Sequence, residues 1–183
     1  MTIVVGADSG REAILRAARK RFARLPYAAV TLRDIAADAS VSASLIVKHF
    51  GGKESLFDAV ADFTSAADAL WDAPLADLGV HAVRTLVEHR RAHQSDLLVR
   101  VVFAAGGDDE RSLLRQRFQE QIVSRLAERL SGPDRAVRAE LAVAQLLGLG
   151  AAMAVNRDGP VATADLALVI DRYAPAIQAL VDG

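Results

Sequence analysis

Cysteine is absent from this sequence of 183 residues, and aromatic residues and prolines are scarce. Without cysteine the chain can form neither disulfides nor thiolate metal sites. Aromatic residues make up only 5% of the chain and there are five prolines, whereas alanine and leucine are abundant. Alanine, leucine, arginine and glutamate lose little side-chain entropy in a helix, so this composition favours helices over strands. We therefore expect an all-α protein.

Signals for export, membrane insertion and catalysis are also missing. No N-terminal segment combines basic residues with an apolar stretch, so no signal peptide is predicted. The longest charge-free apolar run, Leu141–Val155, is shorter than the ~18 residues that indicate a membrane span. The sequence contains no GxGxxG, P-loop or GxSxG motif. We expect a cytoplasmic protein that is not an enzyme, needs no cofactor and has no membrane partner.

Histidines give only a weak metal signal. His89 and His93 share a helix face four residues apart, and His81 lies two turns upstream. The segment lacks the glutamate of the zinc-protease pattern, and no carboxylate is evidently placed as a third ligand. Solvated histidines near a helix C-terminus, where the helix dipole favours them, explain the pattern. We predict no metal site.

Charge is distributed unevenly along the chain. Up to Ser55 there are 9 Lys/Arg and 5 Asp/Glu, a net charge of +4, whereas the remainder carries 13 and 18, a net charge of −5. A basic N-terminal third on an acidic remainder suits a polyanion-binding module joined to a domain with another task. A difference of this size also arises by chance, so charge alone leaves both interpretations open.

The N-terminal segment divides into an arm and a helix. Residues 1–10 contain turn-forming residues and little periodicity, and we predict a flexible arm. From Arg11 onward, apolar residues recur at steps of three and four, which is helical spacing. Pro26 should end this helix, because proline interrupts the hydrogen-bond ladder.

Two short helices joined by a tight turn are predicted next. The Thr31 hydroxyl can cap a helix that has Asp34 at its third position. Residues 39–41 form the turn, and Ser42 is the natural N-cap of the following helix, which reaches about His49. This arrangement is the helix-turn-helix geometry.

The second of these helices has two unlike faces. At 100° per residue, Ala43, Ile46 and Phe50 lie on one face and can pack against the preceding helix. The opposite face holds Ser44, Leu45, Val47 and Lys48. A DNA-recognition helix can use this mixture, since lysine reaches phosphate or guanine, serine bonds to polar edges, and leucine or valine contacts thymine methyl groups. An ordinary helical hairpin with an exposed leucine is the alternative.

A longer pattern extends from Ile14 to Phe57. Its members, in order, are Ala17, Ala18, Phe22, Tyr27, Thr31, Leu32, Arg33, Asp34, Ile35, Ala36, Val41, Ser42, His49, Phe50, Lys53, Glu54, Leu56 and Phe57. In this order and spacing the pattern resembles the N-terminal domain of the tetracycline-repressor (TetR) family. The segment SLIVKHFGGK is similar to a branch of that family with a Leu-Ile/Val-x-x-His-Phe-Gly-x-Lys recognition region. Pro26 and Ser40 stand where the family has glycines, and Leu45-Ile46-Val47 replaces its common Thr-Leu-Tyr.

The resemblance implies the chemistry of a DNA contact surface. It places Thr31, Arg33 and Lys53 on phosphates. Candidates for base or groove contact are Ser42, Ser44, Leu45 and Lys48, flanked by Val47 and His49. The alternative for His49 is packing against Phe50.

The remainder of the chain is predicted to be a helical bundle. Turn residues delimit helices at about 53–71, 75–93, 95–105, 109–130, 134–156 and 163–181. The fold class is therefore all-α, with a three-helix helix-turn-helix DNA-binding domain at residues 11–52. A helical effector-binding and dimerisation domain follows at residues 53–183.

The last helices are predicted to form a subunit interface. Leu141–Val155 is apolar on nearly every face, so it must be buried on all sides, and an intrachain core is the alternative. The predicted interface residues are Gln145, Leu146, Leu149, Met153, Ile170, Tyr173, Ile177 and Leu180. By resemblance, an effector pocket lies between about Lys53 and Leu130, with candidate residues Phe63, Trp71, Arg100, Phe103, Phe118 and Gln121.

Together these features predict a ligand-responsive homodimeric repressor that binds double-stranded operator DNA. A small-molecule effector of unknown identity would release it from a palindromic operator. The rival hypotheses are a helical ligand- or partner-binding protein that no longer binds DNA, and a small helical enzyme.

Overall fold

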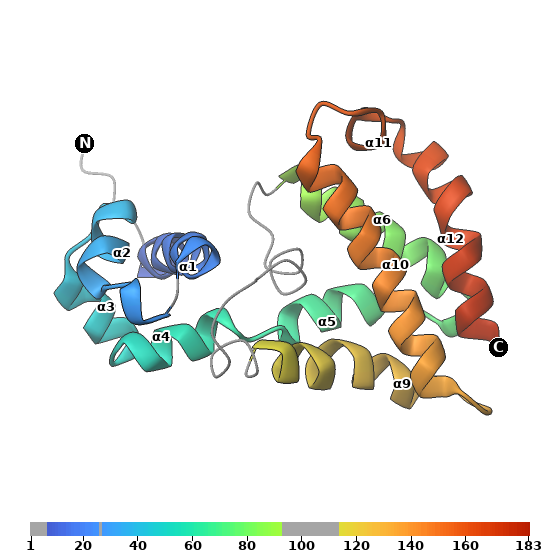
Figure 1. Ribbon diagram of the computed structural model, residues 1–183, viewed down its shortest axis with the longest axis horizontal. Helices are drawn as coiled ribbons and strands as arrows, with labels where there is room; N and C mark the ends of the chain where they lie inside the picture. The colour runs from blue at the N-terminus through green and yellow to red at the C-terminus, as the bar shows by residue number, and fades with distance from the viewer. Residues whose placement is uncertain (1–6, 26, 93–113) are drawn as a thin grey trace. The chain divides into compact units, whose positions relative to one another are not determined.

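The computed structural model describes residues 7–25, 27–92 and 114–183, and no strand occurs among them. Helices form two compact units that divide between Asp62 and Phe63 (Figure 1). The predicted all-α fold class is therefore confirmed.

Unit 1 contains the predicted helix-turn-helix. Its elements are α1 (Ala7–Arg24), the 3-10 turn η1 (Tyr27–Ala29), α2 (Leu32–Asp38), α3 (Ala43–Phe50) and α4 (Lys53–Val60). Helix α1 packs against the other three helices. The core of unit 1 contains fully buried aliphatic side chains from all four helices: Ile14, Ile35, Ile46 and Leu56.

Helix α1 begins at Ala7, so residues 7–10 are helical and not part of a flexible arm. Turn-forming residues there did not prevent the helix, because helix propensity is a weak preference that packing overrides. A Cβ atom at Gly10 would lie 3.9 Å from Leu45 Cδ2, in ordinary contact with α3. Pro26, predicted to end this helix, lies outside the described residues.

Unit 2 is a bundle built around two long helices. Its elements are α5 (Thr64–Trp71), η2 (Leu75–Asp77), α6 (Leu78–Ala92), the π-helical turn η3 (Gln119–Ser124), α9 (Arg125–Arg129), α10 (Arg135–Val155), α11 (Pro160–Thr163) and α12 (Leu166–Asp182). Helix α6 packs against α5, α10 and α12. The predicted helix at 95–105 and the start of that at 109–130 lie outside the described residues.

The close contact between α6 and α12 depends on one glycine. A Cβ atom at Gly79 would stand 2.7 Å from the carbonyl oxygen of Ala174, too close for any real side chain. The Gly79 backbone N–H donates to Gln178 Oε1 at 2.8 Å, and Gln178 Nε2 donates to the Leu75 carbonyl at 2.9 Å. The missing side chain therefore lets α12 approach α6, and Gln178 of α12 bonds both to α6 and to the preceding turn η2.

The single long helix predicted from Lys53 to Trp71 is wrong, because the chain interrupts it at residues 61–63. At the interruption, the Phe63 backbone N–H donates to Gln121 Oε1 at 2.6 Å. This amide therefore finds its partner in a side chain 58 residues away and not in the preceding helical turn. No local signal in the sequence marks such a contact.

Helix α10 is the one described helix that is long and apolar enough to cross a membrane, by length and composition only. One side of it is buried in unit 2, including Val143, Leu146 and Met153. The alternative of a purely intrachain core does not hold for this helix, since Leu141 is 49% exposed and Val155 83% exposed. The predicted subunit interface stays a prediction.

Candidate nucleic-acid interface and ligand cavity

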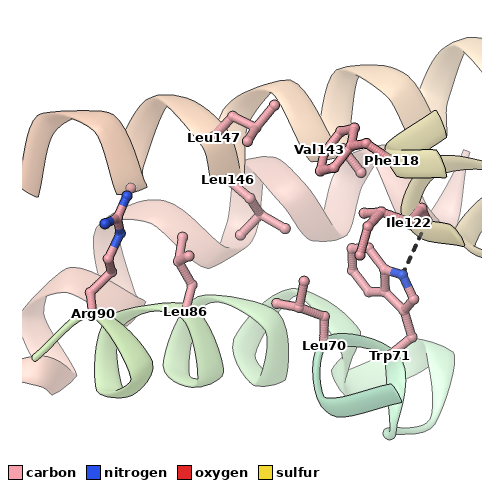
Figure 2. Close-up of a pocket in the computed structure, with 10 residues that line it drawn as sticks. Leu70, Trp71, Leu86, Arg90, Phe118, Ile122, Val143, Leu146 and Leu147 are labelled. Carbon is pink, nitrogen blue, oxygen red and sulfur yellow. Dashed lines mark hydrogen bonds between the residues drawn. The ribbon is translucent and has the colours of Figure 1, made fainter. Parts of the chain in front are cut away.

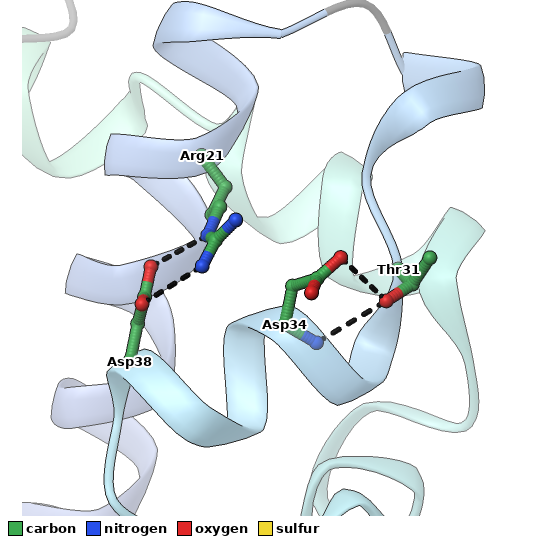
Figure 3. A network of polar contacts seen from close by, with 4 residues as sticks. All are labelled: Arg21, Thr31, Asp34 and Asp38. Atoms are coloured by element: carbon green, nitrogen blue, oxygen red, sulfur yellow. Dashed lines mark hydrogen bonds and ion pairs between the residues drawn. The ribbon is translucent and has the colours of Figure 1, made fainter.

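Both short helices of unit 1 begin at the predicted side-chain caps. Thr31 Oγ1 accepts a hydrogen bond from the Asp34 backbone N–H at 3.2 Å and donates to Asp34 Oδ2 at 2.7 Å (Figure 3). Ser42 Oγ accepts from the Leu45 backbone N–H at 3.2 Å. These bonds satisfy backbone donors that a helix start otherwise leaves open, and they set where α2 and α3 begin.

The turn between α2 and α3 contains a residue with positive φ, at the position where the TetR family has a glycine. Ser40 has a φ of 54°, in the left-handed region. A residue with a side chain reaches this region at a cost that glycine avoids. Ser40, which stands in place of that glycine, therefore still adopts the left-handed conformation in this turn.

Helix α3 presents a mixed surface on the side facing away from the core of unit 1. Ile46 is fully buried, whereas Val47 is 48% exposed. Ser44 and Lys48 are exposed as well. Ser44 Oγ lies 2.9 Å from Ser42 Oγ, so the two hydroxyls share a hydrogen bond at the start of the helix.

An ion pair holds α2 against α1. Arg21 Nε and Nη2 donate to the two carboxylate oxygens of Asp38 at 2.6 and 2.9 Å, a two-pronged contact (Figure 3). The hydrogen bond that Arg21 donates to Asp38 raises the pKa of Arg21; desolvation opposes this rise, and the negative charges of Asp38 and Asp34 add to it. The pair orients α2, which carries Thr31 and Arg33 at its start.

A cluster of aromatic rings in unit 1 contacts the basic residue Lys53. The rings of Phe22, Tyr27 and Phe57 contact one another with centroids 5.0 to 5.8 Å apart. Lys53 Nζ lies 4.1 Å from the centroid of the Tyr27 ring. This cation–π contact restrains the ammonium group at the start of α4. Sequence reasoning identified Lys53 but missed the role of Tyr27 in placing it.

All nine predicted DNA-contact residues lie on α2, α3, their caps or the first residue of α4, elements that contact one another. Exposed among them are Thr31, Arg33, Ser42, Ser44, Val47 and Lys48; partly exposed are Leu45, His49 and Lys53. The His49 ring centroid is 6.3 Å from that of Phe50, so this side chain stays close to a packing neighbour.

Unit 2 encloses a small apolar cavity between α5, α6, η3 and α10 (Figure 2). It is lined by Leu70, Trp71, Leu86, Arg90, Phe118, Ile122, Val143, Leu146, Leu147 and Gly150. Its volume is about 10 Å³, roughly what one water molecule requires. Trp71 Nε1–H donates to the Ile122 carbonyl at 3.2 Å, so the indole closes one end of the cavity with its polar atom already bonded.

Two of the predicted pocket residues, Trp71 and Phe118, line this cavity. Phe63 and Gln121 do not line it; Gln121 holds the Phe63 amide, and the Phe63 ring meets Phe118 edge-on at 5.5 Å. Arg100 and Phe103 lie outside the described residues.

Arg90 is a cavity residue that sequence reasoning missed. Its Nε and Nη2 atoms are buried. A Cβ atom at Gly150 would lie 3.3 Å from Nη2, so the glycine leaves room for the guanidinium against α10. The sequence contains both residues, an arginine on one amphipathic helix and a glycine on another. Only the packing of α6 against α10 shows that they meet.

The predicted dimer residues fall into two groups. Buried in the core of their own chain are Leu146, Leu149, Met153 and Ile177. Partly exposed are Gln145, Ile170, Tyr173 and Leu180. Tyr173 Oη donates to the Gln145 carbonyl at 2.8 Å, which ties α12 to α10, and burial raises the pKa of this phenol.

Within the described ranges, no three side chains of the His, Asp or Glu type come together as a metal site. His81 Nε2 lies 2.8 Å from the Ala69 carbonyl oxygen, to which a ring N–H can donate. His93 lies outside the described residues.

Comparisons with known proteins agree with this arrangement. Residues 14–60 match the family model described as bacterial regulatory proteins, tetR family, and residues 76–181 match the model described as tetracyclin repressor-like, C-terminal domain. An HTH-type transcriptional repressor of Mycobacterium tuberculosis is 47% identical over 57 residues. This match covers 31% of the chain and 30% of that repressor, so it spans under a third of the relative's length.

Solved structures extend the likeness to the whole chain. A TetR-family regulator from Streptomyces coelicolor A3 is 28% identical, covers 100% of both chains and has a TM-score of 0.57. The fatty acid degradation regulator FadR from Bacillus halodurans has a TM-score of 0.66 at 16% identity, covering 94% of this chain and 98% of its own, and so shares the fold. Since the C-terminal model alone spans more than half of the sequence, the chain belongs to the TetR family of bacterial regulatory proteins, a family of non-enzymatic transcriptional regulators.

Proposed function

We propose that this protein is a cytoplasmic, homodimeric repressor that reads a palindromic operator with helix α3 and is released by a small molecule bound in unit 2. The observation that carries the proposal is the outer surface of α3. There Ser44, Val47 and Lys48 are exposed beside Ser42, while Ile46 anchors the helix from behind. An exposed valine beside a lysine and two hydroxyls suits a groove lined by phosphates, base edges and methyl groups.

In this proposal each predicted contact residue has a distinct task. Thr31, Arg33 and Lys53 bind phosphates and fix the orientation of the unit. The residues proposed to contact base edges are Ser42, Ser44, Leu45 and Lys48. Val47 and His49 flank that surface. The tyrosine of the common recognition helix is replaced by Val47, so we expect an operator different from those of relatives that carry it.

We assign the chain to the branch with the Leu-Ile/Val-x-x-His-Phe-Gly-x-Lys recognition region. The glycine of that motif is Gly51, whose φ of 85° ends α3 in the left-handed region. A side chain is strained in this conformation, which gives a physical reason for glycine after the His-Phe pair.

Homodimerisation is proposed to use the exposed side of α10 together with α12. Val137, Leu141 and Val155 are exposed apolar residues on α10, and Leu168 is one on α12. The partly exposed Gln145, Ile170, Tyr173 and Leu180 remain candidates for this interface. A two-fold dimer would present its two α3 helices to half-sites about one helical turn apart, ~34–36 Å on B-form DNA.

Release by the effector is proposed to pass through Phe118. This residue lines the cavity and its ring also contacts Phe63, the first residue of unit 2. A ligand that displaces Phe118 would disturb Phe63 and the Gln121 bond that holds its amide, and hence the start of the link back to α4. Energetically, the ligand acts only as far as it binds the released state more tightly.

The test is fluorescence anisotropy with a labelled duplex from upstream of the protein's own gene, against a scrambled duplex of equal length. Specific binding should weaken linearly with the logarithm of salt concentration, with a slope near −0.9 for each neutralised phosphate. Lys48→Ala should weaken it about tenfold or more, the scale of a lost base contact. The matched control is Lys20→Ala, an exposed lysine on α1 outside the proposed surface.

Equal binding of both duplexes at every salt concentration would contradict specific reading of that operator. Failure to select any preferred sequence from random duplexes would reject the repressor and favour a ligand- or partner-binding protein.

A further inference from the structure

We propose that the cavity of unit 2 takes an amphipathic small molecule with an anionic head, a carboxylate or phosphate, which Arg90 binds while the apolar body extends toward Trp71. This inference rests on the proposed function, since it names the chemical class of the effector. It is carried by the position of one guanidinium at the wall of an otherwise apolar space.

Arg90 brings a positive charge to the cavity from the last turns of α6. Its Nε and Nη2 are buried, and the other described residues that line the cavity are aliphatic, aromatic or glycine. On the facing helix, Gly150 has no side chain to push the guanidinium aside: a Cβ there would lie 3.3 Å from Nη2 and 3.4 Å from Nε. The two helices therefore accommodate a planar cationic group at their contact.

The chemistry of the guanidinium selects the charge of the ligand. Parallel N–H donors match the two oxygens of a carboxylate or phosphate, and charge-assisted bonds strengthen away from water. An ammonium group in the same place would be repelled by Arg90 and would be left with an uncompensated charge in an apolar space. A neutral alcohol gains apolar contact but no ionic bond.

The opposite end of the cavity suits an apolar body. Figure 2 shows Arg90 and Trp71 at the two ends of the drawn residues, with Leu86, Leu146 and Leu70 between them. The Trp71 indole N–H already donates to the Ile122 carbonyl, so this end offers a ring face and no polar donor. Ile122 belongs to the π-helical turn η3, a distortion that often accompanies functional sites.

The cavity must widen to admit such a ligand. About 10 Å³ holds roughly one water molecule, so side chains such as Leu147, only partly buried on α10, have to move. The cost of opening lowers the apparent affinity, because only the open fraction binds. The same opening would move Phe118, the residue proposed to transmit release.

The experiment uses the chain's single tryptophan, Trp71, as a reporter in the cavity wall. The full-length protein is titrated with octanoate, octyl phosphate, octanol and octylammonium, each below its micelle concentration, while tryptophan emission is recorded. We expect one or both anions to bind roughly tenfold or more tightly than octanol, the scale of a buried charged hydrogen bond. The tighter of the two anions identifies the head group, and octylammonium should be the weakest ligand.

Variants assign the preference to one residue. Arg90→Gln should reduce the affinity for the anion to that for octanol while leaving octanol binding intact, which shows that the cavity is still formed. Arg90→Lys should recover part of the preference. The matched control is Arg84→Gln on the same helix, an exposed arginine that does not line the cavity, and its affinities should equal those of the original protein.

Three results would overturn the inference: no binding of any probe, octanol binding as tightly as the anions, or an anion preference that survives Arg90→Gln. Operator binding without ligand is measured on the same proteins by anisotropy. If the original protein binds the operator but shows no preference for the anions, the ligand class is rejected and the repressor is kept. If it prefers the anions but does not bind the operator, the ligand class is kept and the repressor is rejected.

Discussion

The hydrogen bonds that set the helix starts of unit 1 and those that join the helices of unit 2 differ greatly in their reach along the chain. In unit 1, the caps of α2 and α3 are hydrogen bonds between residues three apart, Thr31 with Asp34 and Ser42 with Leu45. In unit 2, the Trp71–Ile122 bond joins residues 51 apart and the Gly79–Gln178 bond residues 99 apart. The first kind can be read from a short window of sequence, and the second cannot.

The same difference in sequence separation distinguishes the candidate DNA surface from the ligand cavity. The candidate DNA surface lies on one stretch of sequence, residues 31–53, whose helix starts are set by local caps; the Arg21–Asp38 pair and the Tyr27 ring also help to position it. The ligand cavity draws its walls from helices distributed between Leu70 and Gly150. A change in unit 1 should therefore have local consequences, whereas a change in unit 2 should be felt across several helices.

The largest expected effect comes from emptying either core. Ile46→Ala in unit 1 and Leu126→Ala in unit 2 each remove a fully buried side chain and should cost about 2–5 kcal/mol of unfolding free energy. Urea unfolding is followed by circular dichroism and by Trp71 emission, which reports unit 2 alone. We expect Leu126→Ala to shift the emission midpoint and Ile46→Ala to leave it in place. Equal shifts for both variants would mean that the units unfold as one.

A smaller effect is expected where α6 meets α12. In Gly79→Ala the new methyl group would lie 2.7 Å from the Ala174 carbonyl oxygen, and such overpacking costs about 1–3 kcal/mol. The Trp71 transition in urea should move to lower concentration. Gly148→Ala, on α10 of the same unit, is the matched control, because the nearest atom to its Cβ position is Tyr173 Oη at 3.8 Å, an ordinary contact, so its midpoint should not fall. An unchanged midpoint for Gly79→Ala would show that the α6–α12 contact is looser than described.

Removing the N-cap of α3 should lower the free energy of unfolding by less than the Gly79 substitution does. Ser42→Ala loses the hydroxyl that accepts the Leu45 amide, a change worth about 1 kcal/mol. The loss should appear in the circular dichroism transition and should leave the Trp71 transition unmoved. Ser65→Ala, at an exposed position of α5, serves as the control. A stability loss confined to the Trp71 transition would contradict the assignment of the cap to unit 1.

The smallest effect concerns pH. Burial raises the pKa of Tyr173, so in alkaline solution the unfolded tyrosine, with a pKa of about 10, loses its proton first. The unfolded state then binds fewer protons than the native state, and the free energy of unfolding of unit 2 should fall as the pH rises through 10. Tyr173→Phe should flatten this fall. Tyr27→Phe, in unit 1, should leave it unchanged, and a fall that persists in Tyr173→Phe would assign it to other groups.

Sequence reasoning succeeded where the determinants are local. The all-α class, the N-caps Thr31, Ser42 and Gly52, and the turn at residues 39–41 were all predictable, because each depends on neighbours within a helical turn. It failed at residues 61–63, where Gln121 takes the Phe63 amide, and it did not show which side of α10 packs in the chain and which side leaves Leu141 and Val155 exposed. Periodicity says that a helix has an apolar face, but not which neighbour covers it.

By itself, then, the sequence determined the all-α class, the caps of the two short helices, the family pattern between Ile14 and Phe57, and the identity of the residues on the outer face of α3. Tertiary structure alone decided that Arg90 meets Gly150 at an apolar cavity, that Gly79 admits α12, and that Phe118 connects the cavity to Phe63. The physical reason is that caps and helical periodicity depend on hydrogen bonds within one turn. A cavity, in contrast, exists only where side chains remote in sequence fail to fill the same space.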